Sequence, residues 1–220
     1  MPVIKAFVFD VYGTLFDVHS VIEKCEEYFP EKGESISKTW REKQIQYSNL
    51  RQIMNNYETF FTITKDALHY AIKAHDREFD DDSERALLGE YFKLAPYPEV
   101  KEVLEKLDGK MLAVFSNGSH DMLDPLIDQS ELTGMFDNVI SVDEVKQYKP
   151  AVASYNHAAK TLGVTPDEAL FMSSNGWDIS GAKNYGFNTA WINRNNLPVE
   201  ELNLEPNAIY GDLAGILEWV

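Results

Sequence analysis

The sequence is poor in cysteine and in positive charge. Its 220 residues include a single cysteine, Cys25, which excludes an internal disulfide and fits a reducing compartment. Twenty lysines and arginines stand against 36 aspartates and glutamates, so the net charge is −16. Nucleic acids and acidic membranes both bind positive protein surfaces. Neither is therefore expected as a partner, and an anionic substrate would depend on a few local cations.

The sequence also lacks segments that would direct the chain to a membrane. No apolar run approaches the roughly 20 residues that span a bilayer, and Met1-Pro2 leads into an apolar segment without a signal-peptide core. We therefore expect a soluble, cytoplasmic protein. Metal-ligand spacing of histidine and the Gly-x-Ser-x-Gly nucleophile turn are missing as well. The histidines are thus expected at the surface or in packing: His19, His69, His75, His120 and His157.

Helical segments dominate between residues 16 and 96. Four segments there carry apolar residues at helical spacing with no strand between them, and Pro96-Tyr97-Pro98 ends the block. The expected helices cover 18–28, 37–55, 60–71 and a segment from about residue 82, with a break at Pro30 and Gly33 and with Ser83 as an N-cap.

From Glu99 onward helices and strands alternate, as in parallel sheets with right-handed crossovers. Strands are expected at 3–9, 110–115, 138–141, 169–172 and 189–192, with a last strand and helix within 208–220. The predicted fold class is α/β: a Rossmann-like parallel sheet core, residues 1–15 and 97–220, with an inserted all-helical cap domain, residues 16–96. A hydrophobic content of 44% suffices for one core with such a lid.

Asp10 directly follows the first expected strand. Ligands of open parallel sheets bind at the carboxyl ends of strands, so a carboxylate there is a candidate for chemistry, although a turn or cap aspartate also fits. The run Phe9-Asp10-Val11-Tyr12-Gly13-Thr14-Leu15-Phe16-Asp17 resembles the nucleophile loop of the haloacid dehalogenase superfamily. Phosphatases of that superfamily carry a second aspartate, two residues after the nucleophile, which protonates the leaving alkoxide.

Tyr12 stands at that position here. A halide ion is a very weak base and leaves without a proton, so breaking a carbon–halogen bond needs no acid at this place. The loop therefore looks like that of the L-2-haloacid dehalogenases. The resemblance implies that Val11 and Tyr12 contact the substrate and that Thr14 orients the carboxylate of Asp10.

Two further motifs follow expected strands. Ser116-Asn117-Gly118 alone reads as a helix cap with a tight turn, and the resemblance implies that Ser116 binds the substrate carboxylate and Asn117 lines the halide side. Lys149, before Pro150, resembles the third motif, whose ammonium keeps the nucleophile ionised beside an anionic substrate. Tyr155 matches a family position near the site, or is a half-buried core tyrosine.

The strand expected at 169–172 leads into Ser173-Ser174-Asn175-Gly176-Trp177-Asp178. In phosphatases the matching segment holds a magnesium ligand, usually from an aspartate pair, whereas this run has one aspartate among serine and asparagine. The resemblance implies that Ser173, Asn175 and Asp178 orient Lys149 and position the hydrolytic water, and a capped helix start is the alternative. No metal or cofactor is implied.

In the helical block, Trp40-Arg41-Glu42-Lys43-Gln44 resembles the dehalogenase cap helix, in which the arginine meets the departing halide. A fixed cation at developing negative charge favours such a step, although an arginine on an exposed helix is usually solvated. Ile45, Phe60 and Trp177 would then be apolar walls around the substrate. Whether Phe60 or Phe61 faces inward stays open.

The resemblance covers almost the whole chain and implies an (S)-2-haloacid dehalogenase. Such an enzyme hydrolyses short L-2-haloalkanoic acids to (R)-2-hydroxy acids and halide through an ester on Asp10. The 2-haloacid substrate and the halide product are thus the expected small-molecule partners. A phosphatase of the same fold and a catalytically idle anion-binding relative are the alternatives. Relatives commonly dimerise through the cap, so a homodimer is expected.

Overall fold

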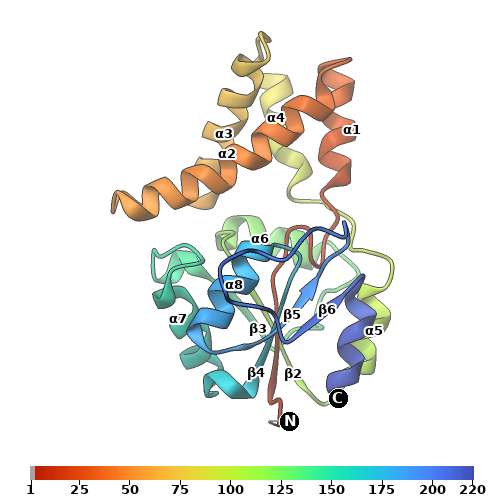
Figure 1. Cartoon of the computed structure of the whole chain (residues 1–220). Helices are drawn as coiled ribbons and strands as arrows, with labels where there is room; N and C mark the ends of the chain where they lie inside the picture. The colour runs from red at the N-terminus through yellow and green to blue at the C-terminus, as the bar shows by residue number, and fades with distance from the viewer. Residues whose placement is uncertain (1–2) are drawn as a thin grey trace.

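The computed structural model describes residues 3–220 and contains one sheet of six parallel strands (Figure 1). The strands lie in the order β3-β2-β1-β4-β5-β6, which is Rossmann-like. The predicted α/β class is therefore confirmed. The strands are β1 (Ala6–Phe9), β2 (Met111–Ser116), β3 (Asn138–Ser141), β4 (Ala169–Ser173), β5 (Asn188–Ile192) and β6 (Ala208–Tyr210).

β1 lies inside the sheet because all four of its side chains are buried. Its Phe7 pairs with Leu112 of β2 and with Leu170 of β4. From β1 the chain builds β2 and β3 on one side, and then β4, β5 and β6 on the other, so the strand order reverses between β1 and β4. Ligands bind in the crevice at the carboxyl ends of the strands at such a point. β1 begins at Ala6 instead of Val3, which is 78% exposed.

Helices connect the strands from β1 to β5, and one more helix follows β6. They are α5 (Val100–Lys106), α6 (His120–Asp128), η1 (Val142–Glu144), α7 (Val152–Leu162), η2 (Pro166–Glu168), α8 (Gly176–Tyr185) and η3 (Leu213–Trp219). α7 packs against α8, and α5 packs against η3, as Figure 1 shows. α7 ends at Gly163, whose φ of 65° closes the helix in the left-handed conformation that glycine adopts freely.

The residues between β1 and α5 form four helices that lie together beyond one edge of the sheet (Figure 1). They are α1 (His19–Tyr28), α2 (Gly33–Ile53), α3 (Phe60–Ala74) and α4 (Asp81–Glu90). The helices enclose Trp40, whose ring lies edge-on to Tyr91 with 5.1 Å between the ring centroids and whose Nε1 donates to the carbonyl of Thr64 at 2.7 Å. This packing gives the block an apolar centre of its own.

Two details of the helical block differ from the prediction. Gly33 opens α2 instead of breaking the chain, because α1 crosses so closely that a Cβ at this residue would lie 2.2 Å from the backbone nitrogen of Glu26. Ser83 is not the N-cap of α4. Asp80 holds that position, and its carboxylate accepts the N–H of Ser83 at 2.8 Å. Aspartate and serine both favour the N-cap position, so the sequence from Asp80 to Ser83 fits a helix that starts after either residue.

The chain enters and leaves the helical block through two adjacent linkers. The N–H of Asp17 donates to the carbonyl of Ala95 at 2.9 Å, and the N–H of Tyr97 donates to the carbonyl of Leu15 at 2.9 Å. The segment that carries the Asp10 loop is therefore hydrogen-bonded to the segment that returns from the helices.

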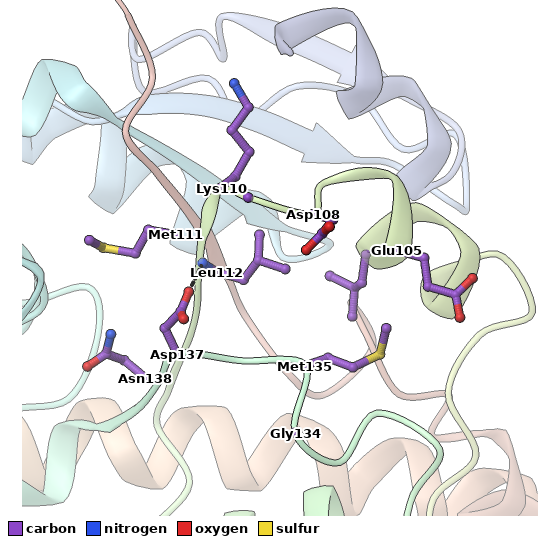
Figure 2. A pocket seen from close by; sticks show the side chains of 11 residues that line it. Glu105, Asp108, Lys110, Met111, Leu112, Gly134, Met135, Asp137 and Asn138 are labelled. Atoms are coloured by element: carbon purple, nitrogen blue, oxygen red, sulfur yellow. Dashed lines mark hydrogen bonds between the residues drawn. The ribbon is translucent and has the colours of Figure 1, made fainter.

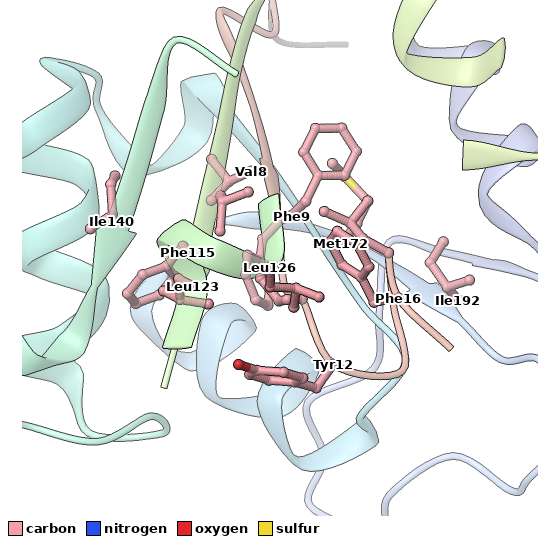
Figure 3. Close-up of a cluster of buried hydrophobic side chains, with 14 of the residues drawn as sticks. Val8, Phe9, Tyr12, Phe16, Phe115, Leu123, Leu126, Ile140, Met172 and Ile192 are labelled. Atoms are coloured by element: carbon pink, nitrogen blue, oxygen red, sulfur yellow. The ribbon is translucent and has the colours of Figure 1, made fainter. Parts of the chain in front are cut away.

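The hydrophobic core continues from the sheet up to the Asp10 loop. Figure 3 shows Val8 and Phe9 of β1 together with Phe115, Met172 and the ring of Tyr12. Tyr12 is 4% exposed, so the loop after β1 is anchored in the core. Among residues 3–220, no helix combines the length and the apolar character that crossing a membrane requires.

Replacing Phe171 of β4 by alanine should lower the free energy of unfolding by about 3–5 kcal/mol, because a fully buried ring is lost and a cavity remains. Its ring contacts those of Phe115 and Tyr155, each 6.1 Å away between centroids. Urea unfolding measures the loss. The control Leu202→Ala, at a side chain that is 57% exposed, should stay within about 0.5 kcal/mol of the parent. Equal losses in both variants would contradict this description of the core.

Candidate active site

A surface cavity at the amino ends of β2 and β3 does not contain the predicted site. Its volume is about 840 Å³, and Figure 2 shows Lys110, Met111, Asp137 and Asn138 around it. The carboxylate of Asp137 is occupied by the N–H of Leu112, at 2.8 Å. None of the predicted site residues lines this cavity. The chemistry therefore has to be sought at the opposite edge of the sheet, where Asp10 follows β1.

A second, much smaller cavity lies at that carboxyl edge, between the sheet and α2. The centres of water-sized molecules can occupy about 20 Å³ of it, which is room for about one water molecule, so a larger ligand requires rearrangement. Ten of its eleven lining residues are predicted site residues, and Ser48 is the addition. The lining residues are Asp10, Tyr12, Arg41, Ile45, Ser48, Phe60, Ser116, Asn117, Lys149, Asn175 and Trp177.

Asp10 forms the floor of this cavity and is 6% exposed. Its Oδ2 accepts hydrogen bonds from the hydroxyl of Thr14 at 2.9 Å, the amide of Asn175 at 3.1 Å and the hydroxyl of Ser173 at 3.3 Å. Its Oδ1 accepts from Nζ of Lys149 at 3.0 Å. One cation and three neutral donors thus hold the carboxylate in a single orientation.

Lys149 is buried and uses all three of its ammonium protons. Besides Asp10, Nζ donates to Oδ2 of Asp178 at 2.6 Å and to the carbonyl of Phe115 at 3.1 Å. Its own N–H donates to Oδ1 of Asn117 at 2.9 Å, which ties the second predicted motif to the third. Burial lowers the pKa of Lys149, but the attraction of the two carboxylates outweighs it. The pKa therefore lies above its ordinary value and the amine is charged.

Asp178 lies behind Lys149 and does not line the cavity. Its Oδ1 accepts from the hydroxyl of Tyr155 at 2.7 Å, and its Oδ2 is the oxygen that accepts from Lys149. Burial raises the pKa of Asp178 to about 6, against the opposing attraction of Lys149. Burial likewise raises the pKa of Tyr155 well above its ordinary value, so the phenol stays protonated and donates. Tyr155 is fully buried, not half-buried.

Thr14 is held in turn by the segment 173–178 at the end of β4. Its Oγ1 accepts the N–H of Ser174 at 2.8 Å while it donates to Asp10. Gly13, which precedes Thr14 in the loop, has a φ of 85°, and a Cβ on it would lie 3.1 Å from Oγ of Ser174. Glycine is therefore required for the loop to turn this close to β4.

The second motif closes the cavity on the β2 side. Oγ of Ser116 accepts the N–H of Gly118 at 3.1 Å. A Cβ on Gly118 would lie 2.9 Å from Cδ2 of Leu123 and 3.2 Å from the ring of Tyr12, so a larger residue here would displace the side chain of Leu123. Ser116 and Asn117 line the cavity from this turn.

Helix α2 contributes Arg41, Ile45 and Ser48 to the roof of the cavity. Arg41 donates from Nη1 to Oε1 of Gln44 at 2.9 Å, and among residues 3–220 no carboxylate forms an ion pair with it. Spacings of four and three place these residues on one face of the helix. Ser48 could therefore have been found from the position of Arg41.

Phe60, and not Phe61, faces the cavity. Its ring stacks on Tyr12 with 6.2 Å between centroids, whereas Phe61 packs on Phe92 at 6.0 Å. The hydroxyl of Tyr12 and Nε1 of Trp177 are buried and have no hydrogen-bond partner among residues 3–220. Two unused donors thus belong to side chains that line the cavity.

Five predicted residues lie next to the cavity without lining it: Val11, Thr14, Tyr155, Ser173 and Asp178. The side chain of Val11 is fully buried and does not line the cavity, and its contact with the substrate stays a prediction. The other four donate to, accept from or support Asp10 and Lys149, as described above. The sequence did not single out Phe115 and Ser174. The carbonyl of Phe115 accepts from Lys149 and the N–H of Ser174 donates to Thr14, and any residue could supply these backbone groups.

Replacing Tyr155 by phenylalanine should lower the free energy of unfolding by about 1–3 kcal/mol, because Oδ1 of buried Asp178 loses its donor. Urea unfolding measures the change. The matched control is Tyr185→Phe, on a half-buried tyrosine whose hydroxyl is 3.4 Å from Oδ1 of Asn156. That variant should stay within about 0.5 kcal/mol of the parent. A Tyr155→Phe protein as stable as the control would contradict the described role of the hydroxyl.

Comparisons with known proteins agree with this geometry. The family model of haloacid dehalogenase-like hydrolases matches residues 4–186. The chain is 39% identical over 222 residues to an (S)-2-haloacid dehalogenase of Pseudomonas putida, with 100% of this chain and 98% of that protein covered. It is 45% identical over 191 residues to an (S)-2-haloacid dehalogenase of Xanthobacter autotrophicus, with 87% and 76% covered.

Solved structures match over nearly the full length. The crystal structure of one L-2-haloacid dehalogenase has a TM-score of 0.97 at 42% identity and covers 99% of each chain. The Xanthobacter autotrophicus L-2-haloacid dehalogenase with chloropropionic acid covalently bound has a TM-score of 0.92 at 37% identity, with 98% of this chain and 97% of that chain covered. Sequence, fold and site thus agree, and this chain belongs to the haloacid dehalogenase-like hydrolases.

Proposed function

We propose that this protein is an (S)-2-haloacid dehalogenase that converts short L-2-haloalkanoic acids into (R)-2-hydroxy acids and halide. The observation that carries the proposal is the setting of Asp10. This carboxylate lies at the floor of a small cavity and contacts one cation and three neutral donors, with Arg41 in the roof. The relatives named above are (S)-2-haloacid or L-2-haloacid dehalogenases, and one was solved with chloropropionic acid covalently bound.

In the first step Asp10 attacks the carbon that bears the halogen. A new C–O bond forms, the C–halogen bond breaks, and the bond's electron pair leaves with the halide, so the configuration inverts. Lys149, whose Nζ lies 3.0 Å from Oδ1 of Asp10, supplies positive charge that offsets the approach of an anionic substrate to this carboxylate. Even at about 4 Å, a cation contributes roughly 4 kcal/mol at an effective dielectric near 20. Thr14, Ser173 and Asn175 fix the angle of attack.

The leaving halide needs positive charge and no proton. Arg41 is the lining cation that is free of a carboxylate partner within residues 3–220, and Asn117 lies on the same cavity. Burial raises the pKa of Tyr12 far above its ordinary value, so its phenol is a poor acid at neutral pH. A phosphatase would need an effective acid at this position. This observation favours dehalogenation over phosphate-ester hydrolysis.

In the second step water attacks the carbonyl carbon of the Asp10 ester and the bond from this carbon to the ester oxygen breaks. The hydroxy acid leaves with that oxygen and takes up one proton of the water, while the other proton passes to the solvent and the carboxylate of Asp10 is restored. Asn175 lines the cavity and reaches Asp10, so it is the residue that we assign to the water, while Asp178 acts from behind through Lys149. Ser116 binds the carboxylate of the substrate. Ile45, Phe60 and Trp177 enclose its short carbon chain, and residues 16–96 serve as the cap that brings Arg41 and two of these walls.

The remaining partner predictions also belong to this proposal. We infer a cytoplasmic homodimer that binds neither nucleic acid nor membrane, in line with the net charge of −16. Exposed apolar side chains on α2 and just beyond it support self-association: Leu50 is 43%, Ile53 81% and Met54 60% exposed.

The function is tested by chloride release from L-2-chloropropionate in the presence of EDTA. The protein should release chloride, Asp10→Asn should abolish the release, and the control Asp17→Asn, seven residues later in the same segment, should retain it. Phosphate release from p-nitrophenyl phosphate with Mg²⁺, without chloride release, would instead indicate a phosphatase. If the protein releases neither chloride nor phosphate, it is an idle anion-binding relative.

A second experiment, with isotope-labelled water, locates the covalent bond. In a single turnover with excess enzyme in ¹⁸O water, the label should enter the carboxylate of Asp10, because water attacks the ester carbonyl and the original oxygen leaves with the product. Mass spectrometry of the peptide that contains Asp10 detects it. Label in the hydroxy acid on that first turnover would mean that water attacks the substrate directly.

The turnover number should fall as the pH is lowered through about 6, since protonated Asp178 no longer attracts Lys149. Protonation of Asp178 does not by itself destabilise the fold. The pKa of Asp178 is about 6 in the native protein and 3.8 in the unfolded chain. Between these two pH values the native protein binds a proton that the unfolded chain does not. This group therefore stabilises the fold more at low pH. Chloride release between pH 4.5 and 8, with circular dichroism as the folding control, measures the effect. A turnover number unchanged down to pH 4.5 would contradict the need for ionised Asp178.

A further inference from the structure

Arg194 is a partly buried arginine for which the reaction described above has no use. It follows β5 in the loop that leads to β6, and its side chain is 15% exposed. Its Nη2 donates to Oε1 of Glu99 at 2.6 Å and to the carbonyl of Thr14 at 3.0 Å. Its guanidinium lies over the ring of Tyr97, 3.6 Å from the centroid. One side chain thus touches two separate parts of the chain.

The first of these parts is the Asp10 loop. Thr14 contacts Asp10 with its hydroxyl at 2.9 Å and Arg194 with its carbonyl at 3.0 Å. The hydroxyl is also fixed by the N–H of Ser174 at 2.8 Å. Thr14 is therefore held from both ends of the residue. A shift of its carbonyl would rotate the peptide unit and move the hydroxyl away from the nucleophile.

The second part is the linker that returns from the helical block. Tyr97 and Glu99 lie just beyond the last helix of the block, and the N–H of Tyr97 donates to the carbonyl of Leu15 at 2.9 Å. Glu99 is anchored independently of Arg194, since it also accepts the N–H of Leu213 at 3.3 Å. Burial raises the pKa of Glu99, but its hydrogen bonds outweigh this and the net pKa is lowered, so the pair with Arg194 is charged.

We propose that Arg194 is a positioning residue for the nucleophile: by joining the carbonyl of Thr14 to Tyr97 and Glu99, it sets the orientation in which Thr14 holds Asp10. This inference rests on the proposed dehalogenase function. A misdirected carboxylate still leaves the binding groups Ser116 and Arg41 in place. The loss is therefore expected in the turnover number and not in KM, because small errors in the position of reacting groups cost large factors in rate.

The test is a double-mutant cycle between Arg194→Met and Thr14→Val, read by chloride release from L-2-chloropropionate. Methionine keeps the apolar length of the side chain, and valine keeps the shape of threonine without its hydroxyl. Arg194→Met alone should lower kcat about tenfold with KM changed less than about threefold. In the Thr14→Val protein the same substitution should lower kcat less than about twofold, because the hydrogen bond from the Thr14 hydroxyl to Asp10, through which Arg194 acts, is already gone.

Two further variants keep the test decisive if Arg194→Met folds poorly. Arg194→Lys retains the charge but loses the forked geometry and should recover part of the lost kcat. Glu99→Gln removes the ionic anchor and should lower kcat about threefold with the same dependence on Thr14. Arg85→Met, at an exposed arginine of α4 paired with Asp82, is the matched control and should leave kcat unchanged. Urea unfolding monitors the fold of each variant.

The possible results separate the two proposals. A parent protein that releases no chloride overturns the dehalogenase function, before any variant of Arg194 is considered. If the parent is active, a loss of kcat that is equal in the presence and absence of the Thr14 hydroxyl overturns the positioning role, and so does an effect on KM alone or no effect. A loss that disappears in the Thr14→Val background supports it.

Discussion

The contact on which the rest of this site depends is that of the Lys149 ammonium with two carboxylates. Nζ lies 3.0 Å from Asp10 and 2.6 Å from Asp178, in a place where the lysine is 1% exposed. Burying such ions costs several kcal/mol each unless every group is paired. The carbonyl of Phe115 takes the third ammonium proton, and Tyr155 satisfies the second oxygen of Asp178. These pairings offset the cost of burying the three charges.

The sheet makes this arrangement possible. β1, β2 and β4 are adjacent and parallel, so their carboxyl ends, which lead to Asp10, Ser116 and Ser173, meet at one edge. Neighbouring strands lie about 4.8 Å apart, a spacing that side chains of this length can bridge. The rings of Phe115 and Phe171 lie 4.9 and 5.1 Å from Nζ of Lys149 and exclude water from beneath it. Rigid strands therefore hold groups that would repel or be hydrated in solution.

The charge balance explains why the helical block is needed. The protein carries a net charge of −16, and the trio of Asp10, Lys149 and Asp178 has a charge of −1 before an anionic substrate arrives. Within residues 3–220, Arg41 is the cavity-lining cation without a carboxylate partner. Its helix α2 lies in the block, so this positive charge reaches the cavity only because the block covers the sheet. Arg194, at the linkers, connects the two parts next to the nucleophile.

The sequence by itself determined the alternation of elements and the strand-end positions of Asp10, Ser116 and Ser173, because periodicity and turn residues act locally. The chemistry expected of the Asp10 loop came instead from its resemblance to the haloacid dehalogenases. The sequence could not decide the start of α2, since only the crossing of α1 shows that Gly33 fits a close approach. Nor could it choose Phe60 over Phe61, find Arg194, or show how little room the cavity leaves. Only the tertiary structure decided these, because the face that a helix turns inward and the volume left between elements depend on packing between residues far apart in the chain.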